Sequence, residues 1–204
     1  QTEALARIAA KNHANGVHNP YAQLRKDVGV AFCETVSEKN PVVAAPLKRT
    51  DCSPVSDGAA AMVVSSKDVA DAAAQKVRFL ARTQVTDFMP MQQRNPLIFD
   101  GVTKAWENVL REAGMTLDSL SFAEVHDCFT IAELMIYESM GLTPYGEGAR
   151  AIKEGWVMKD GRLPINPSGG LKAKGHPVGA TGVSMHVMAA RQLLDQAGGC
   201  QIAD

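Results

Sequence analysis

The chain has 204 residues and a formal net charge of −1, with 46% hydrophobic and 21% charged residues. This composition excludes an intrinsically disordered chain, which would be poorer in apolar residues and more strongly charged. The near-neutral charge argues against a protein that binds nucleic acid or an anionic membrane surface, since both usually need a basic surplus.

The first half of the chain is predicted to begin and end with regular structure. Residues 2–14 favour a helix, because Leu5, Ile8 and Ala9 recur at helical spacing. Residues 15–57 show little periodicity and are punctuated by prolines, which predicts irregular structure. Residues 59–65 and 77–85 are predicted to be strands, separated by a short helix over residues 67–75.

The second half alternates more clearly. Residues 100–114 are predicted to form a helix that Gly114 ends, and residues 121–126 a strand. A helix is expected over residues 130–140, a glycine- and proline-rich loop over 141–175, and a last helix over about 181–196. Residues 200–203 look like the start of another strand. Strands that alternate with helices predict an α/β protein, a layered sheet with covering helices.

The spacing of the cysteines and the length of the apolar runs indicate in which cellular compartment the protein is expected. The cysteines are Cys33, Cys52, Cys128 and Cys200, which form no Cys-x-x-Cys pair. Widely spaced thiols are typical of a reducing environment, so we expect a cytoplasmic protein. No apolar run approaches the roughly 20 residues of a membrane span, and the first residues lack the features of a signal peptide.

The first segment that could carry chemistry runs from Glu124 to Phe129, at the junction of a predicted strand and helix. In an extended backbone, His126 and Cys128 point to one side and Asp127 to the other. Ligands of open α/β sheets bind at such strand ends, and a neighbouring imidazole can lower the pKa of a thiol. The alternative is a buried cysteine beside a hydrogen-bonded histidine.

The second segment covers residues 166–182, where glycines surround His176 just before a helix. Pro177 stiffens the backbone at His176, whose imidazole could act as a general base or donate to an oxyanion. The alternative is a glycine-rich connector. His176 stands where a phosphate-binding loop needs lysine, and the glycine spacing does not match a dinucleotide-binding motif. A zinc-deaminase pattern also fails, because Cys128 stands where it needs glutamate, so we expect no metal.

Together, His126-Asp127-Cys128-Phe129 and the run from Gly175 to Gly182 resemble the thiolase superfamily, in its sterol-carrier-protein-type branch. The segment 54–61, Pro-Val-Ser-Asp-Gly-Ala-Ala-Ala, is similar to another stretch of that family. The resemblance covers essentially the whole chain. It implies an incomplete thiolase fold: residues 1–85 as a remnant of the loop region and the end of the N-terminal half, and residues 86–204 as the C-terminal domain, truncated at its end.

The resemblance also implies a reaction. Thiolases make or cleave a carbon–carbon bond next to a coenzyme A thioester, through an acyl-cysteine and without a further cofactor. By resemblance His176 is the base that activates the nucleophile, His126 orients the oxyanion-hole water, and Cys128 moves the proton at the substrate α-carbon. Gly175 and Gly179 are expected to bind substrate. The implied partners are acyl-CoA substrates and, in the intact enzyme, a second copy as a homodimer.

One catalytic group of the family has no counterpart here. The nucleophilic cysteine belongs to the N-terminal half, and neither Cys33 nor Cys52 stands at its position. The resemblance therefore implies a portion of an acyl-CoA thiolase that is inactive alone. Two alternatives remain open: a thiolase-like aldolase, a lyase that cleaves a β-hydroxyacyl-CoA without that cysteine, and a non-catalytic thiolase-like module.

Overall fold

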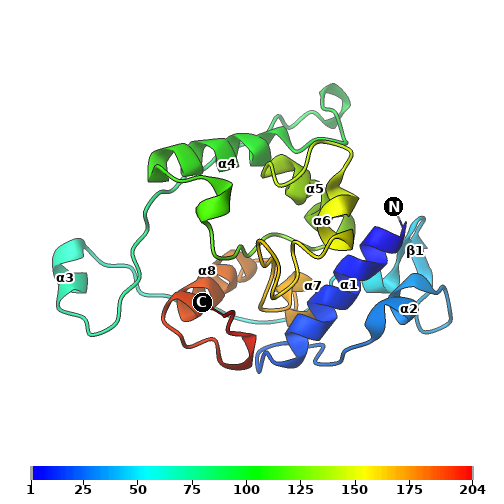
Figure 1. Ribbon diagram of the computed structural model, residues 1–204, viewed down its shortest axis with the longest axis horizontal. Coiled ribbons are helices and arrows are strands. Elements are labelled where there is room, and N and C mark those ends of the chain that lie inside the picture. Colours follow the sequence, from blue (N-terminus) through cyan, green and yellow to red (C-terminus); the bar gives the residue numbers. More distant parts are fainter. Residues whose placement is uncertain (1, 204) are drawn as a thin grey trace.

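The packed part of the protein is built around its first helix. The computed structural model describes residues 2–203, and in it α1 (Thr2–Val17) contacts four other helices. These are α2 (Gly29–Glu34), α5 (Thr130–Ser139), α6 (Gly148–Lys153) and α7 (Gly170–Lys174). Figure 1 shows α1 lying across α7, with α5 and α6 above it. Residues from both ends of the chain therefore share one core.

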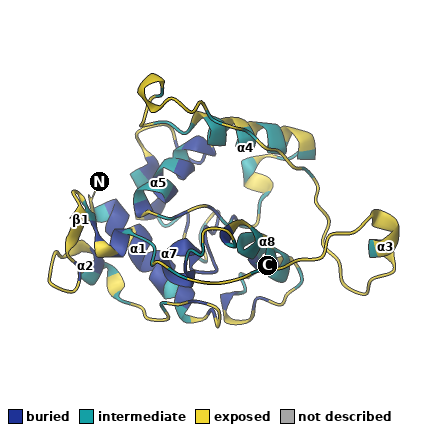
Figure 2. Ribbon diagram, turned by 180° about the vertical axis from the view of Figure 1, so that it is seen from behind, coloured by how far each residue is buried: buried dark blue, intermediate teal, exposed yellow. Residues whose placement is uncertain are grey.

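The core follows from the helical spacing of small and apolar residues. Leu5 and Ile8 of α1 are almost fully buried and belong to one cluster with Tyr137 of α5 and Ile165 of the loop before α7. Figure 2 shows the buried residues concentrated in α1, α5 and α7, whereas the long segment around α3 is exposed. The division of the chain near residue 85 remains a prediction; α1 packs on α2 from the earlier part and on α5, α6 and α7 from the later part.

The remaining helices include α3, which lies away from this core, and others that lie beside it. They are α3 (Lys67–Asp71), α4 (Asp100–Ala113), α8 (Thr181–Leu193) and the 3-10 turns η1 (Arg49–Asp51), η2 (Met91–Gln93), η3 (Leu117–Ser119) and η4 (Gly198–Cys200). Gly114 follows α4 with φ of 64°, a left-handed conformation that suits glycine as a helix end. The predicted helices 2–14, 100–114, 130–140 and 181–196 are confirmed within a few residues, and 67–75 is shorter than predicted.

Strand predictions were mostly wrong. The one sheet among residues 2–203 is an antiparallel pair of β1 (Val42–Ala44) and β2 (Leu47–Lys48), with Val42 opposite Lys48 and Ala44 opposite Leu47. Residues 59–65 and 77–85 make no backbone hydrogen bond with another segment of the described chain, and Val63 is 96% exposed. A strand needs a neighbour to pair its backbone groups, and apolar content alone does not supply one. Residues 200–203 likewise form no strand.

Segments predicted to be irregular contain short elements. Residues 15–57 hold α2, β1 and β2, and residues 141–175 hold α6 and α7. Helices of five or six residues make fewer than two turns, so they show no apolar periodicity for a sequence to reveal. The predicted strand 121–126 is extended but makes a single parallel bridge, between Ala123 and Ile165. That bridge brings the two chemically distinctive segments together.

Candidate active site

The two segments run side by side and are joined by successive hydrogen bonds. The Ala123 amide donates to the carbonyl of Pro164 at 2.9 Å, and the Asn166 amide donates to the carbonyl of Ala123 at 2.8 Å. The side-chain oxygen of Asn166 then accepts from the Val125 amide at 2.8 Å, in place of a backbone carbonyl. Asn166 has φ of 55°, a left-handed conformation that asparagine tolerates better than most residues.

As predicted from the alternation of side chains, Asp127 points to the side opposite His126. Its carboxylate is fully buried and accepts hydrogen bonds from the amides of Leu171 at 2.6 Å and Lys172 at 3.1 Å, in the first turn of α7. His126, one residue earlier, is exposed. Asp127 therefore faces the helix, and His126 faces the opposite side.

His126 and His176 are neighbours. Their ring centroids lie 5.1 Å apart with an interplanar angle of 85°, an edge-to-face arrangement. Partial burial of the ring, and then the charge of His176, lowers the pKa of His126, so its imidazole is neutral at physiological pH. The structure thus brings together two histidines that stand 50 residues apart in the sequence. At this separation both imidazoles can contact the same small ligand.

Thr181 determines which nitrogen of His176 carries its proton. The Thr181 hydroxyl lies 2.8 Å from Nδ1 of His176 and donates to the carbonyl of Pro177 at 3.1 Å. A hydroxyl has a single proton, so Thr181 accepts from Nδ1–H, and Nε2 is left with a free lone pair. The His176 amide also donates to the hydroxyl of Ser56 at 3.4 Å. A histidine that is held through its ring Nδ1 and its backbone amide, with Nε2 free, has the form of a general base.

Cys128 follows His126 by two residues, but its environment differs from the expected one. Its thiol is half-buried, and its carbonyl accepts from the Ser53 amide at 2.9 Å. Burial, followed among the charges by those of Asp127 and Cys52, raises the pKa of the Cys128 thiol. The expectation that an imidazole lowers this pKa is therefore wrong, because desolvation penalises the thiolate.

The two glycines predicted to bind substrate differ in their surroundings. Gly175 is buried with φ of 112°, and a Cβ there would lie 2.9 Å from both the Gln23 side chain and the Ser56 hydroxyl. Gly175 therefore has a packing reason to be glycine. Gly179 is exposed, and a Cβ added to it would have nothing within 4 Å. Substrate binding at either position remains a prediction.

Three residues of this site have roles that the sequence did not reveal. Asp127, Asn166 and Thr181 lie inside the two segments, yet spacing alone assigned them no role. A signal existed for Asn166, because an asparagine followed by proline and two nearby glycines is typical of a turn that needs a left-handed residue. Asp127 and Thr181 act through backbone and side-chain partners that only the folded chain brings near.

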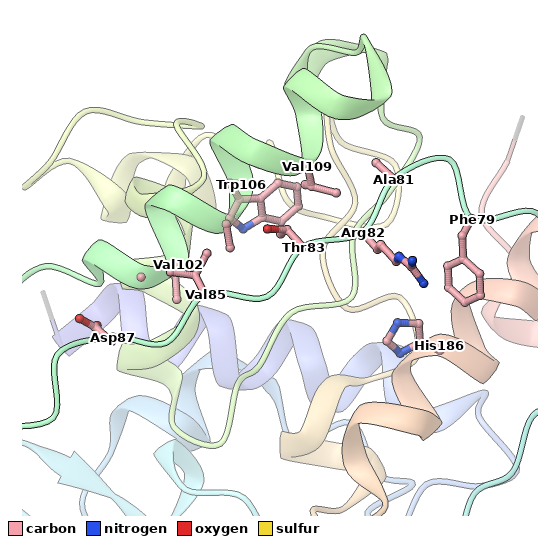
Figure 3. Close-up of a pocket in the computed structure, with 12 residues that line it drawn as sticks. Phe79, Ala81, Arg82, Thr83, Val85, Asp87, Val102, Trp106, Val109 and His186 are labelled. Atoms are coloured by element: carbon pink, nitrogen blue, oxygen red, sulfur yellow. The ribbon is translucent and has the colours of Figure 1, made fainter.

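A surface hollow lies elsewhere, away from the histidine pair. It has a volume of about 490 Å³ between α4 and residues 79–87, and contains neither His126 nor His176. Figure 3 shows Val102 and Trp106 of α4 on one side, with Arg82, Phe79 and His186 toward the other. Its walls are mostly apolar, with Arg82, Asp87 and His186 among them, and we assign the chemistry to the histidine pair instead.

The described residues offer neither a metal site nor a membrane-spanning helix. No three His, Cys, Asp or Glu side chains within residues 2–203 are arranged to hold a metal ion. None of the described helices combines the length and apolar character required to cross a bilayer.

Known proteins similar to this chain cover both segments. A family model described as thiolase C-terminal domain-like matches residues 83–204. An acetyl-CoA acetyltransferase of Methanothermobacter thermautotrophicus is 38% identical over 98% of this chain and 52% of its own length. Sterol carrier protein 2 of Oryctolagus cuniculus is 35% identical, and benzoylsuccinyl-CoA thiolase subunit BbsB of Thauera aromatica 33%, each over 98% of this chain. The chain spans 37% of the former and 51% of the latter.

Solved structures agree with the fold. The Ltp2–ChsH2(DUF35) aldolase superposes with a TM-score of 0.84 at 18% identity, covering 97% of this chain and 52% of that one. A monomeric SCP2-thiolase-like protein type 1 from Mycobacterium smegmatis gives a TM-score of 0.70 at 20% identity, covering 93% and 39%. At these identities the likeness concerns the fold, and it confirms the predicted class of an incomplete thiolase-like α/β architecture.

Proposed function

This chain belongs to the thiolase C-terminal domain-like family, and from that premise we propose that it supplies the acid–base half of an acyl-CoA thiolase active site. It is homologous to acetyl-CoA acetyltransferases. The observation that supports the proposal is the edge-to-face pair of His126 and His176, whose ring centroids lie 5.1 Å apart, with Cys128 two residues after His126 in the sequence.

In the proposed reaction, Cys128 moves the proton at the α-carbon. As a thiolate it takes a proton from the α-carbon of an acyl-CoA, and the resulting carbanion attacks the carbonyl carbon of the acyl-cysteine. The carbon–carbon bond forms while the carbon–sulfur bond breaks, and the released cysteine regains a proton. Because burial raises the pKa of the Cys128 thiol, the resting group is the neutral thiol, which must lose its proton before it can act as this base.

The imidazoles handle the nucleophile and the oxyanion. His176 uses its free Nε2 to take the proton of the nucleophilic cysteine, while Thr181 holds Nδ1. His126 is neutral at physiological pH and orients a donor toward the thioester oxygen on which negative charge develops. Donors aimed at developing charge typically supply the largest single contribution to catalysis. Gly175 and Gly179 line the approach of the substrate.

The test separates acylation from condensation in the natural protein that carries this chain. Cys128→Ala should still form the acyl-enzyme from acetyl-CoA, seen by mass spectrometry. It should lose condensation and α-proton exchange in D2O by about 10²- to 10⁴-fold, the usual contribution of a positioned acid–base group. His176→Ala should lose both steps. Cys52→Ala, a neighbouring half-buried thiol, is the matched control and should keep both.

The outcome that contradicts the proposal is a Cys128→Ala protein with unchanged exchange and condensation. A lyase remains the rival function, because the aldolase with a TM-score of 0.84 shares the fold. Thiolysis consumes free coenzyme A, whereas retro-aldol cleavage of a β-hydroxyacyl-CoA releases a carbonyl compound without it. Cleavage that proceeds at full rate without added coenzyme A would favour the lyase.

Three further parts of the proposal concern the intact protein. Its substrates are acyl-CoA thioesters, in keeping with the acetyl-CoA acetyltransferase and thiolase subunit to which the chain is similar. It needs no cofactor other than coenzyme A, and it works as a homodimer in the cytoplasm. Sedimentation of the purified protein with and without acyl-CoA tests the dimer directly.

A further inference from the structure

A network of buried polar side chains lies on the face of residues 123–127 that points away from His126. It joins α1, α5 and the loop before α7. Its members are each at most 2% exposed: Lys11, Asn12, Asp127, Glu133, Tyr137 and Asn166. Buried polar groups are costly unless they are paired, so a network of this size has a structural or functional reason.

Glu133 of α5 is the centre of this network. Its carboxylate accepts hydrogen bonds from Lys11 Nζ at 2.5 Å, Asn12 Nδ2 at 2.6 Å and Asn166 Nδ2 at 3.0 Å, and also from the Tyr137 hydroxyl. Lys11 Nζ donates in addition to the carbonyl of Ile165 at 2.7 Å. One carboxylate thus ties α1 and α5 to the loop that leads into α7.

Asp127 is the second carboxylate, and it continues the network to α7. Asn12 Nδ2 bridges the two acids, since it also donates to Asp127 Oδ2 at 2.8 Å. The other donors to Asp127 are the amides of Leu171 and Lys172. Asp127 therefore receives three hydrogen bonds, one from α1 and two from the first turn of α7.

The residue before those amides leaves room for the carboxylate. Gly170 has φ of 59°, and a Cβ there would lie 2.2 Å from Asp127 Oδ2 and 2.6 Å from Asp127 Oδ1. No side chain fits at such a distance, so any larger residue must displace either the carboxylate or α7. Gly170 and Asp127 form a matched pair across the two segments.

We propose that Asp127 is a positioning residue: its buried carboxylate fixes α7 against residues 123–127 and thereby holds His176 edge-on to His126. Asp127 directly follows His126, and α7 ends two residues before His176. The bonds from Asp127 to Leu171 and Lys172 therefore form a short link between the two imidazoles. The effect of Asp127 on catalysis rests on the proposed function. The link between the two imidazoles does not, because it consists of hydrogen bonds seen in the structure.

The test measures the interaction between the two imidazoles without relying on activity. Because the charge of His176 lowers the pKa of His126, His176→Ala should raise the pKa of His126, followed by NMR of the protein with ¹⁵N-labelled histidine. In an Asp127→Asn background, where an amide NH2 replaces one acceptor, we expect this response to disappear. The Leu171 amide should also exchange with solvent more than about tenfold faster.

A second variant disturbs the contact between Asp127 and α7 by a change in α7 instead of at Asp127. Gly170→Ala keeps the carboxylate but forces it away from α7, and it should abolish the response of His126 as Asp127→Asn does. It decides the question if Asp127→Asn fails to fold. The matched control is Glu124→Gln, a carboxylate in the same segment that binds Ser168 at 2.8 Å, outside α7. Glu124→Gln should leave the response of His126 unchanged.

The catalytic consequence is measured separately. In the natural protein, Asp127→Asn should lower kcat by about 10²-fold, the cost of misplacing a catalytic group by roughly 1 Å, with a much smaller change in KM. If the response of His126 to His176→Ala persists in both Asp127→Asn and Gly170→Ala, the positioning role is wrong. If the response disappears but no acyl-CoA chemistry is found in the wild type, the proposed function fails and the positioning role stands.

Discussion

At the scale of single residues, burial determines the chemistry of this protein's titratable groups. Burial, followed by the charge of Glu133, raises the pKa of Asp127, and burial raises the pKa of Cys33 to about 11. The same cause acts in the opposite direction on histidine, since it disfavours the charged form of each group. A residue's position in the core, rather than its neighbours in sequence, thus decides when it ionises.

His13 gives a prediction of pH-dependent stability. It is 5% exposed, its Nδ1–H donates to the carbonyl of Lys26 at 3.1 Å, and burial, then the charge of Lys172, lowers its pKa to about 4. In the unfolded chain its pKa is about 6.5, so between pH 6.5 and 4 the unfolded state binds a proton that the folded state does not. Stability should therefore fall as the pH falls through this window.

The measurement compares wild type with His13→Asn by urea unfolding at several pH values. The difference in free energy of unfolding should be constant above about pH 7. At pH 4 the wild type should have lost up to about 3 kcal/mol of stability relative to His13→Asn, which is the free energy that corresponds to the pKa change. Asn keeps a donor for Lys26 and does not titrate. A difference that does not change with pH would contradict the burial of a neutral His13.

Much of the site was predictable at this scale, and the remainder was not. Spacing and the resemblance singled out His126, Cys128 and His176, whose roles remain predictions, and alternation predicted that Asp127 faces away from His126. It could not predict the raised pKa of Cys128, because desolvation depends on packing that spans the whole chain. It also could not predict that Thr181 holds Nδ1 of His176.

At the scale of elements, glycines at two helix starts have opposite environments. Gly148 begins α6, and a Cβ there would lie 2.7 Å from the Leu134 carbonyl oxygen of α5 and 2.9 Å from its Cδ2. Gly182 is the second residue of α8, is exposed, and has nothing within 4 Å of its Cβ position. The first glycine is required for helix packing, whereas the second is not.

The two alanine variants should therefore change stability in opposite directions. Gly148→Ala should lower the free energy of unfolding by about 1–3 kcal/mol, the usual cost of overpacking a close contact. Gly182→Ala should raise it by about 0.5–1 kcal/mol, because alanine is the better helix former. Urea unfolding of both proteins at pH 7 checks this. Equal effects would mean that α6 does not lie against α5 as described.

Elements were predictable where they carry their own periodicity. The helices over residues 2–17, 100–113 and 130–139 have apolar faces that a sequence shows. The strands over 59–65 and 77–85 were inferred from apolar content, and a strand's partner is a property of the tertiary structure. The same limit applies to α7, which is too short to show a pattern and depends on Asp127 for its first turn.

At the scale of the whole molecule, one part is packed and another is extended. The packed part surrounds α1, while residues 59–65 and 77–85 are mostly exposed (Figure 2), and their apolar side chains Val63 and Phe79 are 96% and 55% exposed. Extended backbone with unpaired groups is a template for pairing with another chain. Regions with few buried contacts also open most readily.

Hydrogen exchange should show this division. We expect the amides of residues 59–65 and 77–85 to exchange within seconds, whereas amides of α1 and α5 remain protected at least about 10³-fold longer under the same conditions. Mass spectrometry of peptic fragments at pH 7 and low protein concentration gives the comparison. Strong protection of residues 77–85 at low concentration would contradict their exposed, unpaired state.

The buried pair of Lys11 and Glu133 also has a consequence for biosynthesis. The two residues are 122 positions apart, and Asn12 and Asp127 are 115 apart. At roughly 5–20 residues per second, a ribosome makes the acidic partners on the order of 10 s after the lysine has been added. During that interval α1 can pack on α2 only, so we expect Lys11 and the face of α1 that contacts α5 to stay without their partners until α5 emerges.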